Sequence, residues 1–186
     1  MTYDISAKSK SYQKVDEAIT QSLFALLENN DFEKITVSQI IKKAGINRST
    51  FYRHYVDKYE ILDHIREHTV PVGDAMIAPF IKDGKHSFDI MFNSSYLNDY
   101  VPQSYKRMFL LLLKVRTNNF NMEQLVKDSF ARHYLPGDNS SNIKLERELY
   151  SDICYRLLVH SLTHPEEKVD GHKAINDLVK YINEKN

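Results

Sequence analysis

The chain has 186 residues, with 25 basic and 25 acidic side chains, so it has no net charge and no general attraction for polyanions. Its one cysteine, Cys154, excludes an intrachain disulfide framework and fits a reducing compartment. No signal peptide is recognisable, and the longest apolar run, 108–113, is far shorter than the ~20 residues of a membrane span. With five Gly and five Pro, the sequence predicts an all-α, cytoplasmic protein without a membrane partner.

The first predicted helix covers residues 11–29 and serves as a scaffold for the helices that follow. Apolar residues recur along it at the spacing of one helical face, and Asn29, Asn30 and Asp31 end it. The buried stripe consists of Val15, Ala18, Ile19, Leu23, Leu26 and Leu27.

Residues 35–62 contain three helix starts in quick succession. Thr36 is followed three residues later by Gln39, which is a capping box, and Asp57 with Glu60 repeats the spacing. Asn47 caps the helix between them. Apolar pairs flank the caps at the spacing of hydrophobic staples: Ile35 with Ile40, Ile46 with Phe51, and Val56 with Ile61.

Gly45 separates the first two of these helices. Glycine adopts the left-handed conformation without a Cβ penalty, so Gly45 can end one helix and turn the chain into the next. The next helix begins after Asn47, is about two turns long and starts with polar side chains. This arrangement is typical of a DNA-binding helix-turn-helix, and we call its second helix the reading helix.

Positive charge gathers in the same segment. Residues 34–58 contain six Lys or Arg and one Asp, a net charge of +5, while the whole chain is neutral. A local basic patch on a neutral protein is suited to contact with DNA phosphates.

The segment resembles the DNA-binding motif of the TetR family of bacterial transcriptional regulators. The resemblance covers roughly a quarter of the chain and holds many positions in fixed register. It implies a dimeric, all-helical repressor with a variable ligand-binding domain. The matching residues are Thr36, Val37, Ile40, Ala44, Gly45, Ile46, Ser49, Thr50, Phe51, Tyr52, His54, Tyr55, Lys58, Glu60, Ile61 and Leu62.

The resemblance also implies which side chains meet DNA. The groove-facing residues are expected to be Arg48, Ser49, Thr50 and Tyr52. The phosphate contacts are expected to be Thr36, Arg53, His54 and Lys58. Lys58 would lie in the first turn of its helix, whose amide-rich end already favours phosphate.

The remaining helices form the predicted carboxy-terminal bundle. A helix from 57 to at least 68 connects it to the head, and Pro71 and Gly73 are expected to weaken or kink that helix. Further helices are predicted at 87–100, 102–116, 121–135, 143–163 and 169–183, about nine in total, with a loop at 136–142. The predicted domains are 1–62, a three-helix DNA-binding head, and 63–186, an effector-binding and dimerisation bundle.

Two functions are expected of this bundle. The family resemblance implies a homodimer through the last two helices and a cavity for a small-molecule effector, and Met and aromatic residues are dense between 91 and 134. At helical spacing, each of them is individually more often core than pocket. The pocket candidates are Met91, Tyr96, Tyr105, Met108, Phe109, Leu112 and Phe130.

Three alternatives compete with a ligand-responsive regulator. Residues 64–68 match H-x-x-E-H, an inverted zinc-protease signature, but no third ligand or cleft is recognisable. Eight histidines could supply a regulatory metal site, with His160 and His164 four residues apart. The third alternative is a binding module whose amino-terminal head recruits another protein instead of repressing transcription. No catalytic constellation, metal site or cofactor is expected, and the sequence favours a non-enzymatic homodimeric repressor that binds a palindromic operator in double-stranded DNA.

Overall fold

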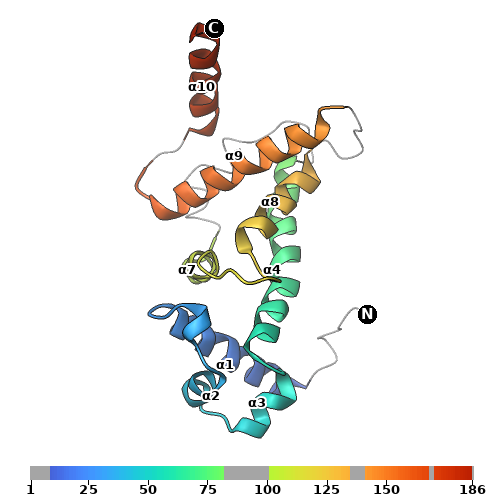
Figure 1. Cartoon of the computed structure of the whole chain (residues 1–186), viewed down its shortest axis with the longest axis vertical. Helices are drawn as coiled ribbons and strands as arrows, with labels where there is room; N and C mark the ends of the chain where they lie inside the picture. The colour runs from blue at the N-terminus through green and yellow to red at the C-terminus, as the bar shows by residue number, and fades with distance from the viewer. Residues whose placement is uncertain (1–8, 82–100, 135–140, 168–169, 186) are drawn as a thin grey trace. The chain divides into compact units, whose positions relative to one another are not determined.

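The structure is a computed structural model that describes residues 9–81, 101–134, 141–167 and 170–185 (Figure 1). Every regular element in these ranges is helical, which confirms the all-α prediction. Besides the short 3-10 helix η2 (Phe32–Lys34), the α-helices are α1 (Lys10–Leu27), α2 (Val37–Ala44), α3 (Arg48–His54), α4 (Lys58–Ile81), α7 (Gln103–Leu112), α8 (Met122–His133), α9 (Ile143–Thr163) and α10 (Gly171–Lys185). The helix predicted at 87–100 lies outside the described residues.

The chain divides into two compact units. The first consists of Met1–Glu67 together with Leu110–Phe120, and the second of His68–Phe109 together with Asn121–Asn186. The division falls within α4, in the helix expected to connect head and bundle. The first unit includes residues 110–120, which the pattern of predicted helices assigned to the second domain.

The core of the first unit joins its two chain segments. Helix α1 packs against α2, and α2 against α3. Apolar side chains from these helices, from Ile35 and from the start of α4 are fully buried together with residues at and just after the end of α7, which explains why 110–120 belongs to this unit. The largest of these buried side chains are Ile19, Leu23, Ile35, Ile40, Phe51, Ile61, Leu62, Leu112 and Val115.

One predicted helix end needs correction, and another lies beyond the minimum that was predicted. Helix α4 continues through Pro71 and Gly73 to Ile81, although a proline removes one backbone hydrogen bond from a helix interior. Just after the proline, the Asp74 carboxylate accepts hydrogen bonds from Ser129 and Arg132 of α8, the latter at 2.9 Å, and these contacts hold the continuing helix. Helix α7 ends at Leu112 instead of 116, and a tight turn closed by Thr117 N–H donating to Phe120 O at 2.9 Å follows it.

The second unit has its own small core between α8 and α9. Phe130 of α8 and Cys154 of α9 are buried, and Val126, Tyr150, Ile153, Leu157, Leu158 and Ile175 pack around them. Burial raises the pKa of the Cys154 thiol to about 12, so this side chain acts as a neutral apolar group. Helix α9 has the predicted bounds. Lys127 adds an ion pair between α8 and α9, at 2.7 Å from Asp152.

Candidate nucleic-acid interface

Local hydrogen bonds define the two helices of the helix-turn-helix. The Thr36 hydroxyl accepts from Gln39 N–H at 3.2 Å, and Thr36 N–H donates to the Gln39 side chain at 2.8 Å, which completes the predicted capping box. Gly45 has φ 66° and ψ 27°, so it occupies the left-handed region as expected. The Asn47 side chain then caps α3 by accepting from Thr50 N–H at 2.7 Å. The segment that reads as a helix-turn-helix therefore forms one.

The reading helix α3 buries the side chains of Phe51 and His54 and exposes most of the others. Phe51 is fully buried and anchors the helix on the core. Its exposed surface carries two arginines among polar and aromatic groups, and Thr50 is half-buried beside them. The exposed members are Arg48, Ser49, Tyr52 and Arg53.

Contacts along α3 hold its two arginines in place before any ligand arrives. Arg48 donates to the Tyr52 hydroxyl at 3.3 Å, and its guanidinium carbon lies 5.3 Å from the Tyr52 ring centroid. One turn away, Arg53 donates to the Thr50 hydroxyl at 3.3 Å. Lys42 and Lys43, in the last turn of α2, are exposed and add two cations to the helix-turn-helix. This segment can meet a polyanion with several cations at once.

His54 takes a different position from the one its sequence pattern predicts. Its side chain is only 4% exposed, and Nδ1 lies 2.6 Å from the Asp16 carboxylate of α1. The Tyr12 ring stacks on the imidazole with 3.8 Å between ring centroids, and the Tyr12 hydroxyl donates to Arg53 O at 3.3 Å. The expected phosphate contact of His54 is not supported, because the ring faces α1 instead of solvent.

Lys58 also points into the protein. Its ammonium group donates to the backbone carbonyls of Phe32, Glu33 and Ile35, at 2.9, 3.0 and 3.0 Å. The expected phosphate contact of Lys58 finds no support in these contacts, because its three N–H groups are already satisfied. Neither Asp16 nor the three carbonyls was identified from the sequence. For Asp16, the available signal was a carboxylate beside the apolar stripe of the first helix.

The five pocket candidates that the structure describes lie in different surroundings. Met91 and Tyr96 lie outside the described residues, Tyr105 is 52% exposed, and Met108 and Phe109 are half-buried. Leu112 is in the core of the first unit and Phe130 in that of the second. The packing supports a core role for these last two side chains.

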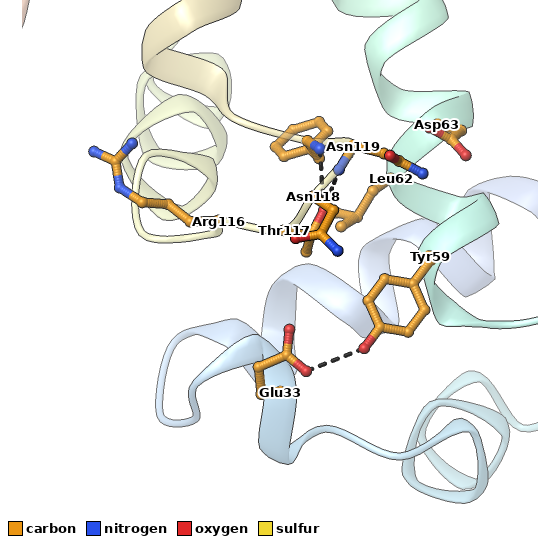
Figure 2. Close-up of a pocket in the computed structure, with 9 residues that line it drawn as sticks. Glu33, Tyr59, Leu62, Asp63, Arg116, Thr117, Asn118 and Asn119 are labelled. Atoms are coloured by element: carbon orange, nitrogen blue, oxygen red, sulfur yellow. Dashed lines mark hydrogen bonds between the residues drawn. The ribbon is translucent and has the colours of Figure 1, made fainter.

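A cavity of about 360 Å³ lies instead within the first unit, beside η2 and the start of α4 (Figure 2). Its wall includes a hydrogen bond from the Tyr59 hydroxyl to the Glu33 carboxylate at 3.0 Å, and this bond raises the pKa of Tyr59. Most of the lining is polar, and its residues are Glu33, Tyr59, Leu62, Asp63, Arg116, Thr117, Asn118, Asn119 and Phe120.

The described part of the chain offers no structural candidate for a metal site or a membrane span. Within the described ranges, no group of three or more His, Cys, Asp or Glu side chains could hold a metal ion. The His64 ring meets Tyr55 edge-on at 5.7 Å, and His160 stacks on His164 at 4.5 Å. None of the helices in those ranges combines the length and apolar character needed to cross a bilayer.

Comparison with known proteins finds similar sequences for the segment that contains the helix-turn-helix. Residues 19–65 match the family model described as bacterial regulatory proteins, tetR family. The chain is also similar to a Bacillus subtilis (strain 168) protein named uncharacterized HTH-type transcriptional regulator YxbF, with 25% identity over 148 residues. That match covers 78% of this chain but only 37% of the relative, so the chain spans well under half of the relative's length.

Proposed function

We propose that this chain, a tetR-family helix-turn-helix protein by its amino-terminal domain, is a transcriptional regulator that binds an operator sequence in double-stranded DNA. The observation that carries the proposal is the exposed face of α3, where two oriented arginines project from a short, doubly capped helix-turn-helix. An α-helix fits the major groove, where an arginine can donate two hydrogen bonds to a guanine.

The side chains proposed to contact DNA fall into two groups by their position. Arg48, Ser49 and Tyr52 are exposed on α3 and Thr50 is half-buried beside them, so these four are proposed to meet base edges. Arg53, at the end of α3, and Thr36, at the start of α2, are proposed to meet phosphates. Thr36 does so while its hydroxyl also caps α2.

The regulator is proposed to act as a homodimer on a palindromic operator and to work as a ligand-responsive repressor. Apolar side chains exposed on α9 and α10 support the dimer: Leu145, Leu149, Leu178, Val179, Tyr181 and Ile182. Two heads related by a two-fold axis would read half-sites about one helical turn, ~34 Å, apart or a small multiple of it. An effector would weaken operator binding only by as much as it prefers the non-binding conformer.

Selection from a pool of random duplexes tests this function. The wild-type chain is expected to enrich one two-fold symmetric sequence, and an Arg48→Ala variant is expected to lose preference at one base pair in each half-site. A pool that remains random after repeated rounds at low salt would refute operator recognition. Enrichment of a sequence without symmetry would refute the dimeric mode alone.

A further inference from the structure

The ammonium group of Lys58 is enclosed by backbone carbonyl oxygens. It donates to Phe32 O at 2.9 Å, to Glu33 O at 3.0 Å and to Ile35 O at 3.0 Å. A lysine ammonium has three N–H donors and no acceptor, so these bonds use its whole donor capacity. The three carbonyls belong to η2 and to the residue after it, immediately before the Thr36 cap of α2.

Aromatic rings complete the surroundings of this charge. Lys58 Nζ lies 4.6 Å from the centroid of the Phe32 ring and 5.3 Å from that of Tyr59. Phe32 is buried, so one wall of the site is part of the core. Carbonyl dipoles and π faces both stabilise a cation, and hydrogen bonds to charged groups are about twice as strong as neutral ones.

We propose that Lys58 is a positioning residue that clamps the start of α4 to the turn before α2, and that it makes no contact with a DNA phosphate. Helix α2 leads through Gly45 into α3, so a tie at the start of α2 sets where the reading helix stands relative to the first turn of α4. The inference rests on the proposed DNA-binding function. It assigns to Lys58 a role in sequence discrimination instead of charge neutralisation.

Substitution by arginine separates the two roles. An arginine keeps the positive charge and binds phosphate well, so Lys58→Arg would preserve affinity if Lys58 met a phosphate. Three convergent carbonyls fit a compact ammonium, whereas the planar fork of a guanidinium does not match them. The clamp therefore predicts that Lys58→Arg behaves like Lys58→Met.

The first experiment measures affinity by fluorescence anisotropy for two duplexes, the sequence selected by the wild-type chain and a scrambled sequence of equal composition. Both Lys58 variants are expected to lose about tenfold or more on the selected duplex, comparable to losing one base pair of readout, and little on the scrambled one. The slope of log K against log salt is expected to stay at the wild-type value.

The matched control is Arg53→Met, which removes an exposed cation from α3. It is expected to weaken both duplexes alike and to flatten the salt slope by about 0.9. Circular dichroism at the assay temperature gives the folded fraction of each variant. A flattened slope in Lys58→Met, full affinity in Lys58→Arg, or a loss of affinity equal to the unfolded fraction would overturn the clamp.

A second experiment needs no DNA, so it separates failure of the clamp from failure of the proposed function. In Lys58→Met, the amides of Ile35 and Ile40, at the turn and the start of α2, are expected to exchange hydrogen about tenfold faster or more. Lys34→Met removes a cation from the same turn, where Lys34 pairs with Asp31 at 75% exposure, and should leave these amides unchanged. Equal exchange in Lys58→Met and the wild type would overturn the clamp, whatever the outcome with DNA.

Discussion

Single residues of the head fall into two classes that the sequence pattern does not distinguish. Arg48 and Arg53 are exposed on α3, and each is oriented by a neighbour on the same helix. His54 and Lys58, a few residues away, are also basic residue types, but each forms hydrogen bonds with groups of the protein itself. Exposure, and not residue type, therefore decides which of these four side chains are available to DNA.

The Arg48–Tyr52 pair gives a prediction about base readout. Arg48→Ala should cost ~1–3 kcal/mol of operator binding if Arg48 contacts a guanine. Tyr52→Phe removes only the hydroxyl that accepts from Arg48, so a smaller loss is expected, and the two losses should not add because the groups touch. Additive losses in a double-mutant cycle on the selected duplex would contradict this coupling.

The His54–Asp16 contact gives a prediction about stability. Asp16→Ala leaves a buried imidazole without its partner and should lower the free energy of unfolding by ~1–3 kcal/mol in urea titrations. His54→Ala should be similarly costly. Arg53→Ala, at the neighbouring exposed position, should stay within ~0.5 kcal/mol of the wild type. The idea fails if both buried-pair variants unfold at the wild-type urea concentration.

At the scale of elements, each helix start in the head depends on a few adjacent residues. The capping box at Thr36, the Asn47 cap and the left-handed Gly45 all involve partners within five positions, so their sequence patterns predict them correctly. The third staple is an exception, because Val56 is 74% exposed while Ile61 is buried. The spacing of nearby residues specifies where a helix starts or turns, but the burial of a side chain depends on tertiary contacts with distant parts of the chain.

Substitutions of Gly45 test how much the left-handed turn between α2 and α3 contributes to stability. No atom lies within 4 Å of where a Cβ would sit, so Gly45→Ala meets no steric obstacle and should cost only the left-handed backbone strain, roughly 1–2 kcal/mol. Asparagine tolerates this conformation better, so Gly45→Asn should lose less. Urea unfolding of the three proteins measures the order, and an alanine variant as stable as the asparagine variant would contradict it.

Long-range contacts mark the limit of what could be predicted from the sequence. Asp16 is 38 positions from His54, and the carbonyls that bind Lys58 are 23 to 26 positions away, so no local pattern reveals them. The same reason explains the placement of residues 110–120 in the first unit, since only tertiary packing brings Leu112 and Val115 into its core. Helix α9 was predictable because its pattern and its breaker, Pro165, are both local.

At the scale of the whole molecule, each of the two units contributes a separate property. The first unit contains the helix-turn-helix and its positive surface. The second contains α10, whose side chains Leu178, Val179, Tyr181 and Ile182 are each about half exposed or more. Such a stripe is costly to leave in water, and the proposed homodimer would cover it.

The proposed dimer predicts a change of mass on substitution. Leu178→Glu places a charge in the apolar stripe and should convert a dimer at micromolar concentration into a monomer in analytical ultracentrifugation. Lys173→Glu alters the charge on the opposite side of α10 and should remain dimeric. A wild-type chain that sediments as a monomer at these concentrations would remove the proposal.

The most direct test of operator recognition is binding to DNA from the region upstream of the protein's own coding sequence, divided into short overlapping duplexes and titrated by anisotropy near physiological salt. Recognition through α3 predicts that one segment binds at least ~10³-fold more tightly than its scrambled counterpart, and that Arg48→Ala removes most of this difference. Equal affinity for this segment and its scrambled counterpart would show charge attraction alone. No binding to any duplex even at low salt would contradict the account altogether.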